Sequence, residues 1–435
     1  MRARLLVLVI FLLLIGGVST ITSAPKKANF IESVSNFVCP AKNGNFQGSI
    51  YLGSQSVKSA VIDNKNRAPK KVRSRLIPLA DKSRVVNGES AAPIVTAMKS
   101  DTWLALSQCA TSTGELWFVG GSADVSSLGY LQFSNENLGK AIIDVELWSE
   151  EGSEPTRTLT IPARSTKNYS LTTFMPGKKL TTFHIVSRSG LVSASLLDER
   201  RKGLQNLGAD FVAPAAPPSK SVVVAGIPGP KFIKNSKFAS QRLRVFIPGE
   251  SDALVKLTYL SSSGVFSPVG LDSVRVPARK VVEIDLSNLP QEKIFSLEVQ
   301  ASEPIVASVI TRGNFSGRQE IVSSSSSLPT NGQSIVLPEQ SGYLVFVSKA
   351  TQAKFIVIGS GAKRSSITQK IDQIGIWKVP DTARMLAFSS HTAPMYLGFL
   401  TANNSGVAGT GLSPTEVKEL TQLPELDSRL YIPRS

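Results

Sequence analysis

The chain of 435 residues contains only two histidines and two cysteines, and this scarcity excludes most metal chemistry. Transition-metal centres in proteins are built mainly from His and Cys ligands. His184 and His391 lie far apart in the sequence, each in a strand-like context, which favours ordinary strand residues over ligands. The sequence also lacks a G-x-S-x-G nucleophile elbow and an H-E-x-x-H motif. We therefore predict no metal site, no cofactor and no catalytic residue, and a protein that is not an enzyme.

Paired carboxylates, which a glycosidase requires, have two candidate positions in the sequence. One is the cluster of Glu150, Glu151 and Glu154, and the other is Asp198-Glu199 beside two arginines. Both clusters mix charges in segments that read as loops of a β-protein, so solvated surface loops are the expectation. The glycine-rich run at 359–365 lacks the spacing of a phosphate-binding loop and predicts a hairpin turn.

The two cysteines, Cys39 and Cys109, fall in the first and last strand-like runs of one segment. In an exported protein an isolated pair usually forms a disulfide. The loop it closes is long, and the chain-entropy model assigns such a bond about 4 kcal/mol. The alternative is that both cysteines are free thiols that serve catalysis or bind a metal. This hypothesis is weaker, because no histidine lies nearby to act as a base or co-ligand.

Long hydrophobic runs are absent except at the start of the chain. Arg2 and Arg4 precede an apolar segment from Leu5 to Val18, and small residues follow up to Ala24. This pattern predicts an export signal over residues 1–24, either cleaved or retained as an N-terminal anchor. Either outcome places the rest of the chain outside the cytoplasmic membrane, secreted or anchored.

Acidic residues are scarce in the first quarter of the chain. The net charge is +16, and residues 1–99 hold fifteen Lys and Arg against four acids. The densest stretch has no interleaved aromatic residues for base stacking, so we predict no nucleic-acid partner. It reads either as a solvated basic loop or as a contact with an anionic membrane surface or wall polymer. Its cations are Lys65, Arg67, Lys70, Lys71, Arg73 and Arg75.

Apolar and polar residues alternate with a period of two in several short runs, such as 143–147, 255–259 and 282–286. Such alternation, with Gly, Ser, Asn and Pro turns between runs, indicates antiparallel strands with one buried face. The segment from Leu131 also repeats from Leu243, and Pro162-Ala163-Arg164 matches Pro277-Ala278-Arg279. A repeat of this length corresponds to a whole β-domain.

The predicted fold is therefore all-β, with tandem immunoglobulin-like antiparallel β-sandwich modules after the N-terminal segment. The outer modules are shorter and divergent. The Pro-rich segment 213–221 and the Ser-rich segment 323–333 are interpreted as linkers, the second of them flexible. The expected modules span residues 37–112, 114–212, 220–322 and 333–409, followed by a short helix and tail over 410–435.

One motif prompts a family comparison. Cys109 is soon followed by Trp117-Phe118-Val119-Gly120-Gly121, and Cys39-Pro40 lies upstream. This pattern resembles a family of exported actinobacterial proteins that carry a domain of unknown function, over residues 37 to about 315. The chain departs from the family pattern in having Asn135-Glu136 and Pro248-Gly249 where Asn-Pro is expected. The resemblance implies an exported, membrane- or wall-associated β-repeat protein without an assigned activity, and it adds no catalytic residue.

Three functions remain open from the sequence. The first is a non-enzymatic cell-envelope protein whose tandem modules form a scaffold or binding surface. The second is an array of polyanion- or carbohydrate-binding modules that uses the basic first module. The third is a cell-wall hydrolase with a site between modules. The sequence identifies no protein partner.

Overall fold

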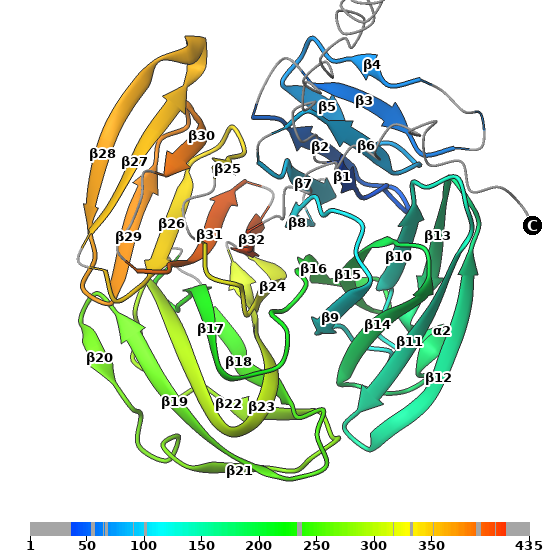
Figure 1. The fold of residues 1–435 in the computed structure, drawn as a ribbon. Helices are drawn as coiled ribbons and strands as arrows, with labels where there is room; N and C mark the ends of the chain where they lie inside the picture. The colour runs from blue at the N-terminus through cyan, green and yellow to red at the C-terminus, as the bar shows by residue number, and fades with distance from the viewer. Residues whose placement is uncertain are drawn as a thin grey trace, which may run out of the picture. The chain divides into compact units, whose positions relative to one another are not determined.

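A computed structural model describes residues 36–53, 57–63, 65, 68–89, 91–99, 102–232, 237–315, 317–330, 334–350, 352–388, 393–404 and 406–414. The expected export signal and the expected helix after Pro414 lie outside these residues. The described part is almost entirely antiparallel β-strand, which confirms the all-β prediction (Figure 1). Within it, no helix has the length and apolar character needed to cross a bilayer.

The described strands fall into four modules of eight consecutive strands, β1–β8, β9–β16, β17–β24 and β25–β32. In the first module, one sheet has the order β1-β6-β3-β4 and the other β5-β2-β7-β8. Its strands are β1 (Asn36–Cys39), β2 (Gln47–Tyr51), β3 (Lys58–Val61), β4 (Lys70–Lys71), β5 (Leu76–Pro78), β6 (Arg84–Asn87), β7 (Ile94–Lys99) and β8 (Trp103–Gln108).

The second module repeats this order, with sheets β12-β11-β14-β9 and β13-β10-β15-β16. A short helix, α2 (Leu171–Phe174), follows β13. The strands are β9 (Glu115–Val119), β10 (Tyr130–Asn135), β11 (Ala141–Ser149), β12 (Gly152–Ile161), β13 (Ser165–Ser170), β14 (Thr181–Ser189), β15 (Ser193–Lys202) and β16 (Gln205–Val212).

In the third module a single 22-residue strand, β23 (Ile294–Phe315), serves both sheets, which sets it apart from the other three modules. Its first half pairs with β17 and β19, and its second half pairs with β18 and β24. The other strands are β17 (Ser219–Pro228), β18 (Lys237–Phe246), β19 (Ala253–Ser261), β20 (Gly264–Phe266), β21 (Val274–Val276), β22 (Val282–Asp285) and β24 (Arg318–Ser325).

The fourth module has sheets β25-β30-β27-β28 and β29-β26-β31-β32, the same order as the first two. The glycine-rich run predicted as a hairpin turn joins β27 to β28 through a short 3-10 turn, η1 (Ser360–Ala362). The strands are β25 (Ile335–Val336), β26 (Gly342–Val347), β27 (Gln352–Gly359), β28 (Arg364–Lys370), β29 (Ile374–Val379), β30 (Ala383–Phe388), β31 (Tyr396–Asn403) and β32 (Gly406–Leu412).

The sequence repeat corresponds to a structural one. Ala194 pairs with Phe133 of β10, and Ala307 pairs with Val245 at the same place in β18. The two Pro-Ala-Arg triplets form equivalent turns, since Arg164 and Arg279 both have positive φ angles, 48° and 57°. Few non-glycine residues adopt this conformation, so its recurrence shows that the two segments share a backbone path.

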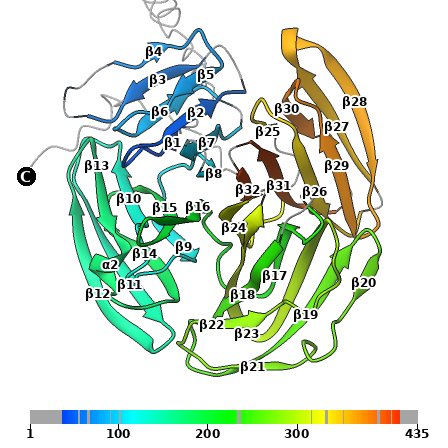
Figure 2. The ribbon, with the colours of Figure 1, turned by 180° about the vertical axis from the view of Figure 1, so that it is seen from behind.

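The last strands of the modules contact one another in a closed cycle: β8 with β16, β16 with β24, β24 with β32, and β32 with β8 (Figures 1 and 2). Hydrophobic clusters run across the module boundaries. Ile94 and Leu106 of the first module share one cluster with Phe346 and Leu397 of the fourth. The first and last modules are therefore packed together although the chain separates them by more than two hundred residues.

The expectation of linkers between modules is wrong. Ser323, Ser324 and Ser325 belong to the buried strand β24, and the two serines that follow are also buried. Ser325 Oγ donates to the carbonyl of Ala213, in the segment interpreted as the other linker, at 2.7 Å. Ser324 Oγ also donates a hydrogen bond, to the carbonyl of Gly226 at 3.2 Å, whereas the hydroxyls of Ser323, Ser326 and Ser327 are buried without a partner among the described residues. The run is therefore part of the packed interior and not a solvated linker.

Candidate functional site

The disulfide predicted in the first module is confirmed. Cys39, at the end of β1, is bonded to Cys109, which directly follows β8, and their Cα atoms lie 4.5 Å apart. Beside the bond, Val38 and Ala110 exchange two backbone hydrogen bonds of 2.8 and 3.2 Å. The bond thus joins the first and last strands of the module and occupies both cysteines of the chain.

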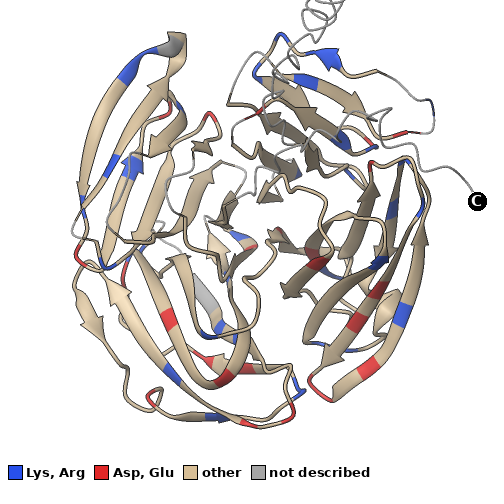
Figure 3. Cartoon of the chain, viewed as in Figure 1, with Lys and Arg blue, Asp and Glu red and all other residues tan. Residues whose placement is uncertain are grey.

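The basic stretch runs along one edge of the first module, where β4 is the outermost strand (Figure 3). Lys70 and Lys71 form this strand and are both exposed. Lys71 lies opposite Lys58 in the pairing with β3. Like charges directly opposite one another destabilise a strand pair, so the edge concentrates positive charge at some cost to the fold. Lys65 and Arg73 are also exposed, and Arg67 lies outside the described residues.

Arg75 differs from the other cations of the stretch. It is half-buried, and its Nη2 donates to the carbonyl oxygens of Leu52 and Gly53 at 3.2 and 2.8 Å. Burial lowers the pKa of this guanidinium. Arg75 therefore holds the chain beyond β2 in place and is a poor candidate for contact with an external anion.

The first carboxylate cluster lies at the hairpin between β11 and β12, as an exposed loop would. Lys178 forms an ion pair with Glu154 at 3.2 Å and a second with Glu151. Glu150 accepts backbone hydrogen bonds from Lys179 and Leu180, both at 2.9 Å. Although partial burial acts in the opposite direction, these amides lower the pKa of Glu150. The cluster fastens two loops together.

The prediction that Asp198 and Glu199 lie in a solvated loop is wrong. Both are buried in the strand β15, where Arg200 also has its side chain inside. Arg200 Nε and Nη2 donate to the two carboxylate oxygens of Asp198 at 3.0 and 2.8 Å. This arginine lowers the pKa of Asp198 although burial acts to raise it. Pairing makes burial of both charges tolerable, and the pair is a structural element at the boundary with the third module.

A second buried arginine lies across that boundary. Arg244 of β18 is fully buried, and its Nη1 donates to the carbonyl of Gly121 in the second module at 2.7 Å. Its Nη2 pairs with Glu283 at 2.7 Å. Arg312 lies near both buried arginines. Its own burial and the positive charges of Arg200 and Arg244 lower the pKa of Arg312 to about 10. The buried arginines between the second and third modules therefore hold these two modules together.

The sequence did not reveal the role of a further buried carboxylate, that of Asp210 in β16. Its side chain is fully buried. Oδ1 accepts from the backbone amide of Leu106 in β8 at 3.1 Å, and Oδ2 accepts from that of Ser323 in β24 at 3.0 Å. The amide of Gly409 in β32 also donates to it. One carboxylate thus binds the inner strand of each of the other three modules.

Two opposing effects act on the pKa of Asp210. Burial raises the pKa well above its usual value, while the amides of Ser323, Leu106, Phe211 and Gly409 act to lower it. These donors all point at the carboxylate, which is the arrangement that stabilises a buried negative charge.

Glu320 of β24 is the second acid at these inner strands. It is 1% exposed, and neither carboxylate oxygen has a hydrogen-bond partner among the described residues. Burial and the nearby Asp210 raise its pKa to about 9. Two glycines make room for it, because a Cβ at Gly406 would lie 2.3 Å from Glu320 Oε1 and one at Gly208 would lie 2.7 Å from its Cα.

His184 is a strand residue, as predicted, and it lies between two carboxylates. Its Nδ1 is 2.8 Å from Glu146 Oε2, and its Nε2 is 2.9 Å from Glu115 Oε1. The ring stacks on Trp117, with centroids 3.8 Å apart and planes 12° apart. The Trp117 indole N–H donates to the same Glu115 oxygen at 3.1 Å. No group of three or more potential metal ligands occurs in the described part of the chain.

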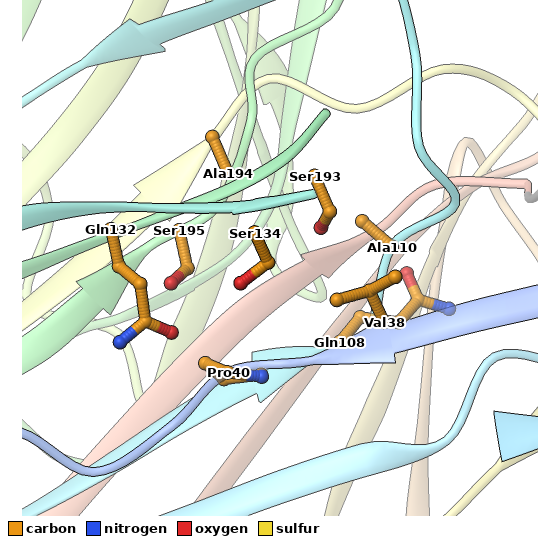
Figure 4. A pocket seen from close by; sticks show the side chains of 9 residues that line it. All are labelled: Val38, Pro40, Gln108, Ala110, Gln132, Ser134, Ser193, Ala194 and Ser195. Carbon is orange, nitrogen blue, oxygen red and sulfur yellow. The ribbon is translucent and has the colours of Figure 1, made fainter. Parts of the chain in front are cut away.

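A small pocket of about 10 Å³ lies where β1 meets β10 and β15 (Figure 4). Gln132 borders it and joins two modules. Its Oε1 accepts from the backbone amide of Ala41 at 2.7 Å and from the Ser83 hydroxyl at 3.1 Å. The volume suits about one water molecule, so this pocket belongs to a polar interface and not to a ligand site.

No curated protein matches this chain. Among solved structures, one from Thermotoga maritima ("Crystal Structure of Thermotoga maritima 1070") shares 13% identity with a TM-score of 0.21, over 25% of this chain and 92% of that chain. A tetra-tandem repeat in the extending region of a large adhesion protein shares 12% identity with a TM-score of 0.11, over 87% and 94%. Residues 87–374 match the model of a family of unknown function, DUF5719, and the chain therefore belongs to that family.

Proposed function

We propose that this protein is a non-enzymatic, exported cell-envelope protein that binds anionic surfaces through the cationic edge of its first module. The cationic edge consists of Lys58, Lys65, Lys70, Lys71 and Arg73. The observation that carries the proposal is the pairing of Lys58 with Lys71 on the edge strands. A repulsive pair on an exposed edge is expected where the charges serve an external partner.

The location outside the cytoplasm and the anchoring or cleavage of residues 1–24 remain predictions from the sequence. The Cys39–Cys109 disulfide supports them, because disulfides persist mainly in oxidising compartments. We also propose that the sandwiches are immunoglobulin-like. The Trp-Phe-x-Gly-Gly motif further suggests that the protein is actinobacterial. A core shared by the two sheets of the second module supports the sandwich.

The alternative of carbohydrate binding receives less support. Sugar rings commonly stack on exposed aromatic faces, but Trp103, Trp117 and Trp148 are buried and Trp377 is half-buried. The alternative of a hydrolase with paired acids between modules meets a different difficulty. Asp210 and Glu320 form such a pair, but both are at most 1% exposed, so a polymeric substrate has no access to them.

Vesicle co-sedimentation of the full-length protein tests the proposal. The variant K65Q/K70Q/K71Q/R73Q removes four cations of the cationic edge and leaves Arg75 in place. The matched control R157Q/K167Q/K256Q/K280Q removes three lysines and one arginine that are exposed elsewhere. Each cation near an anionic bilayer contributes about 1 kcal/mol, so the first variant should lose up to about three orders of magnitude in affinity at low salt.

Neutral vesicles measure any contribution of the apolar N-terminal segment, which does not depend on anionic lipid. Soluble polyphosphate as a competitor distinguishes a general polyanion site from a lipid surface. Equal loss of binding in the two variants, or binding that high salt leaves unchanged, contradicts the proposal.

A further inference from the structure

The inner strands β8, β16, β24 and β32 end on the same side, and a cavity of about 330 Å³ lies there among the segments that follow them. We call it the connector cavity. Residues after β8, after β16, after β24 and at the end of β32 all line it. Its volume falls within the range of about 300–1,000 Å³ that is typical of small-molecule sites.

The walls of the connector cavity combine apolar residues with the polar side chains of Gln108, Thr111, Thr113 and Ser413. Leu116 and Trp117 lie on one strand, Pro214 and Ala216 lie on the segment after β16, and Leu328 lies after β24. Prolines have few conformations available, so these walls lose little entropy when a ligand binds.

The connectors are also fastened to one another. The amide of Ala215 donates to the carbonyl of Trp117 at 2.8 Å, and the amide of Ala216 donates to that of Ser326 at 3.0 Å. Leu328 N donates to the Ser413 hydroxyl at 3.3 Å. Because these bonds join segments of the second, third and fourth modules, the cavity is formed before any ligand arrives.

One ionisable side chain, Glu115, borders the cavity as the described residues define it. Its Oε1 is held by His184 Nε2 and by the Trp117 indole N–H. The side chain is 60% exposed, so Oε2 remains accessible. The hydrogen bond from His184 lowers the pKa of Glu115, which keeps the carboxylate charged at neutral pH.

We propose that the connector cavity binds a small apolar molecule that carries a cationic nitrogen group. The apolar part lies against the Pro214, Ala216 and Leu328 walls, and the cationic group pairs with Glu115. Aromatic stacking contributes little, because His184 covers one face of Trp117 and Trp148 stacks against the ring at a centroid distance of 5.8 Å. Charge and apolar fit therefore set the selectivity. The site is separate from the cationic edge and does not depend on the proposed function.

Titration of the full-length protein with n-octylammonium tests this inference, with n-octanol and octanoate as probes of the same chain length. Tryptophan fluorescence and ligand-observed NMR follow binding. We expect saturable binding of octylammonium, about tenfold weaker binding of octanol, and no saturable binding of octanoate.

Two variants locate the site. E115Q keeps an acceptor for Trp117 but removes the charge, and it should reduce octylammonium affinity to that of octanol. E146Q is the matched control, because Glu146 contacts the other nitrogen of His184 but does not line the cavity. A216L fills the cavity and should weaken octylammonium and octanol alike.

Several outcomes would overturn the inference. They are absence of saturable octylammonium binding, equal affinity for octylammonium and octanoate, equal effects of E115Q and E146Q, and binding that A216L leaves unchanged. Thermal unfolding of each variant distinguishes loss of the site from loss of the fold.

Discussion

Replacement of Asp210 by Asn provides the sharpest test of how the four modules are held together. The native carboxylate accepts amide hydrogen bonds from β8, β24 and β32 and from the amide of Phe211 at 2.9 Å. Asn has one carbonyl oxygen and an NH₂ group that cannot accept. If that oxygen keeps the Leu106 and Phe211 bonds, the amides of Ser323 and Gly409 lose their acceptor.

A buried N–H without an acceptor costs about 1–3 kcal/mol, so two of them predict a loss of about 2–6 kcal/mol for Asp210→Asn. That is a large fraction of the roughly 5–15 kcal/mol that separates folded from unfolded proteins. The loss should be localised, because the orphaned amides lie on the inner strands of the third and fourth modules.

Hydrogen exchange read by mass spectrometry measures this effect by segment. We expect faster exchange in β24 and β32 of the variant, and a lower midpoint of thermal unfolding. Asp272→Asn, at an exposed position, is the control for the loss of one negative charge. Unchanged exchange and an unchanged midpoint in Asp210→Asn would refute the reasoning. Such a result would mean that the native side chain is already protonated and interchangeable with an amide.

Three further predictions concern the same framework. Glu320 has a pKa of about 9 in the folded state against 4.5 as its ordinary value, so the unfolded state loses its proton first as pH rises. The free energy of unfolding of the wild-type protein should therefore fall as the pH rises from about 4.5 to about 9, and it should depend less on pH in Glu320→Gln. Urea unfolding at several pH values measures this, and an equal pH dependence in the two proteins contradicts the assignment. Replacing Cys39 and Cys109 by Ala should cost about 4 kcal/mol and speed exchange in the first module, whereas an unchanged unfolding midpoint would show that the bond adds nothing. Gly208→Ala places a Cβ 2.5 Å from Ile321 N and should destabilise far more than Gly203→Ala, which shares a positive φ but meets no atom within 4 Å; equal effects would mean that backbone strain alone matters.

Local patterns accounted for the strands and for the repeat. The alternation in β11 and β19 is visible because one face of each strand packs on a core and the other meets solvent, and this needs no knowledge of distant partners. The equivalence of Arg164 and Arg279 was visible for the same reason, since a turn is specified by a few consecutive residues. The disulfide prediction needed only the count of two cysteines and the expectation of an export signal.

Charged residues were interpreted less well, because their environment depends on other modules. Asp198 and Arg200 stand beside Glu199 and Arg201 in the sequence, and such a mixed cluster reads as surface. Both are nevertheless buried, with Arg244 and Arg312 of the third module near Asp198, which only the tertiary structure reveals. Arg75 belongs to a run of cations, yet its acceptors lie 22 and 23 residues earlier in the chain.

The amino-acid sequence by itself determined the all-β class, the equivalence of the second and third modules and the pairing of the cysteines, since each depends on neighbouring residues or on a count. Only the tertiary structure decided how the four inner strands meet. The partners of Asp210 are backbone amides, which carry no side-chain signature, and two of them lie 104 and 113 residues away. A lone acid between Ala209 and Phe211 is the single trace of this arrangement in the sequence. Its structural role becomes evident only in the folded protein, where four strands from four modules meet at this one carboxylate.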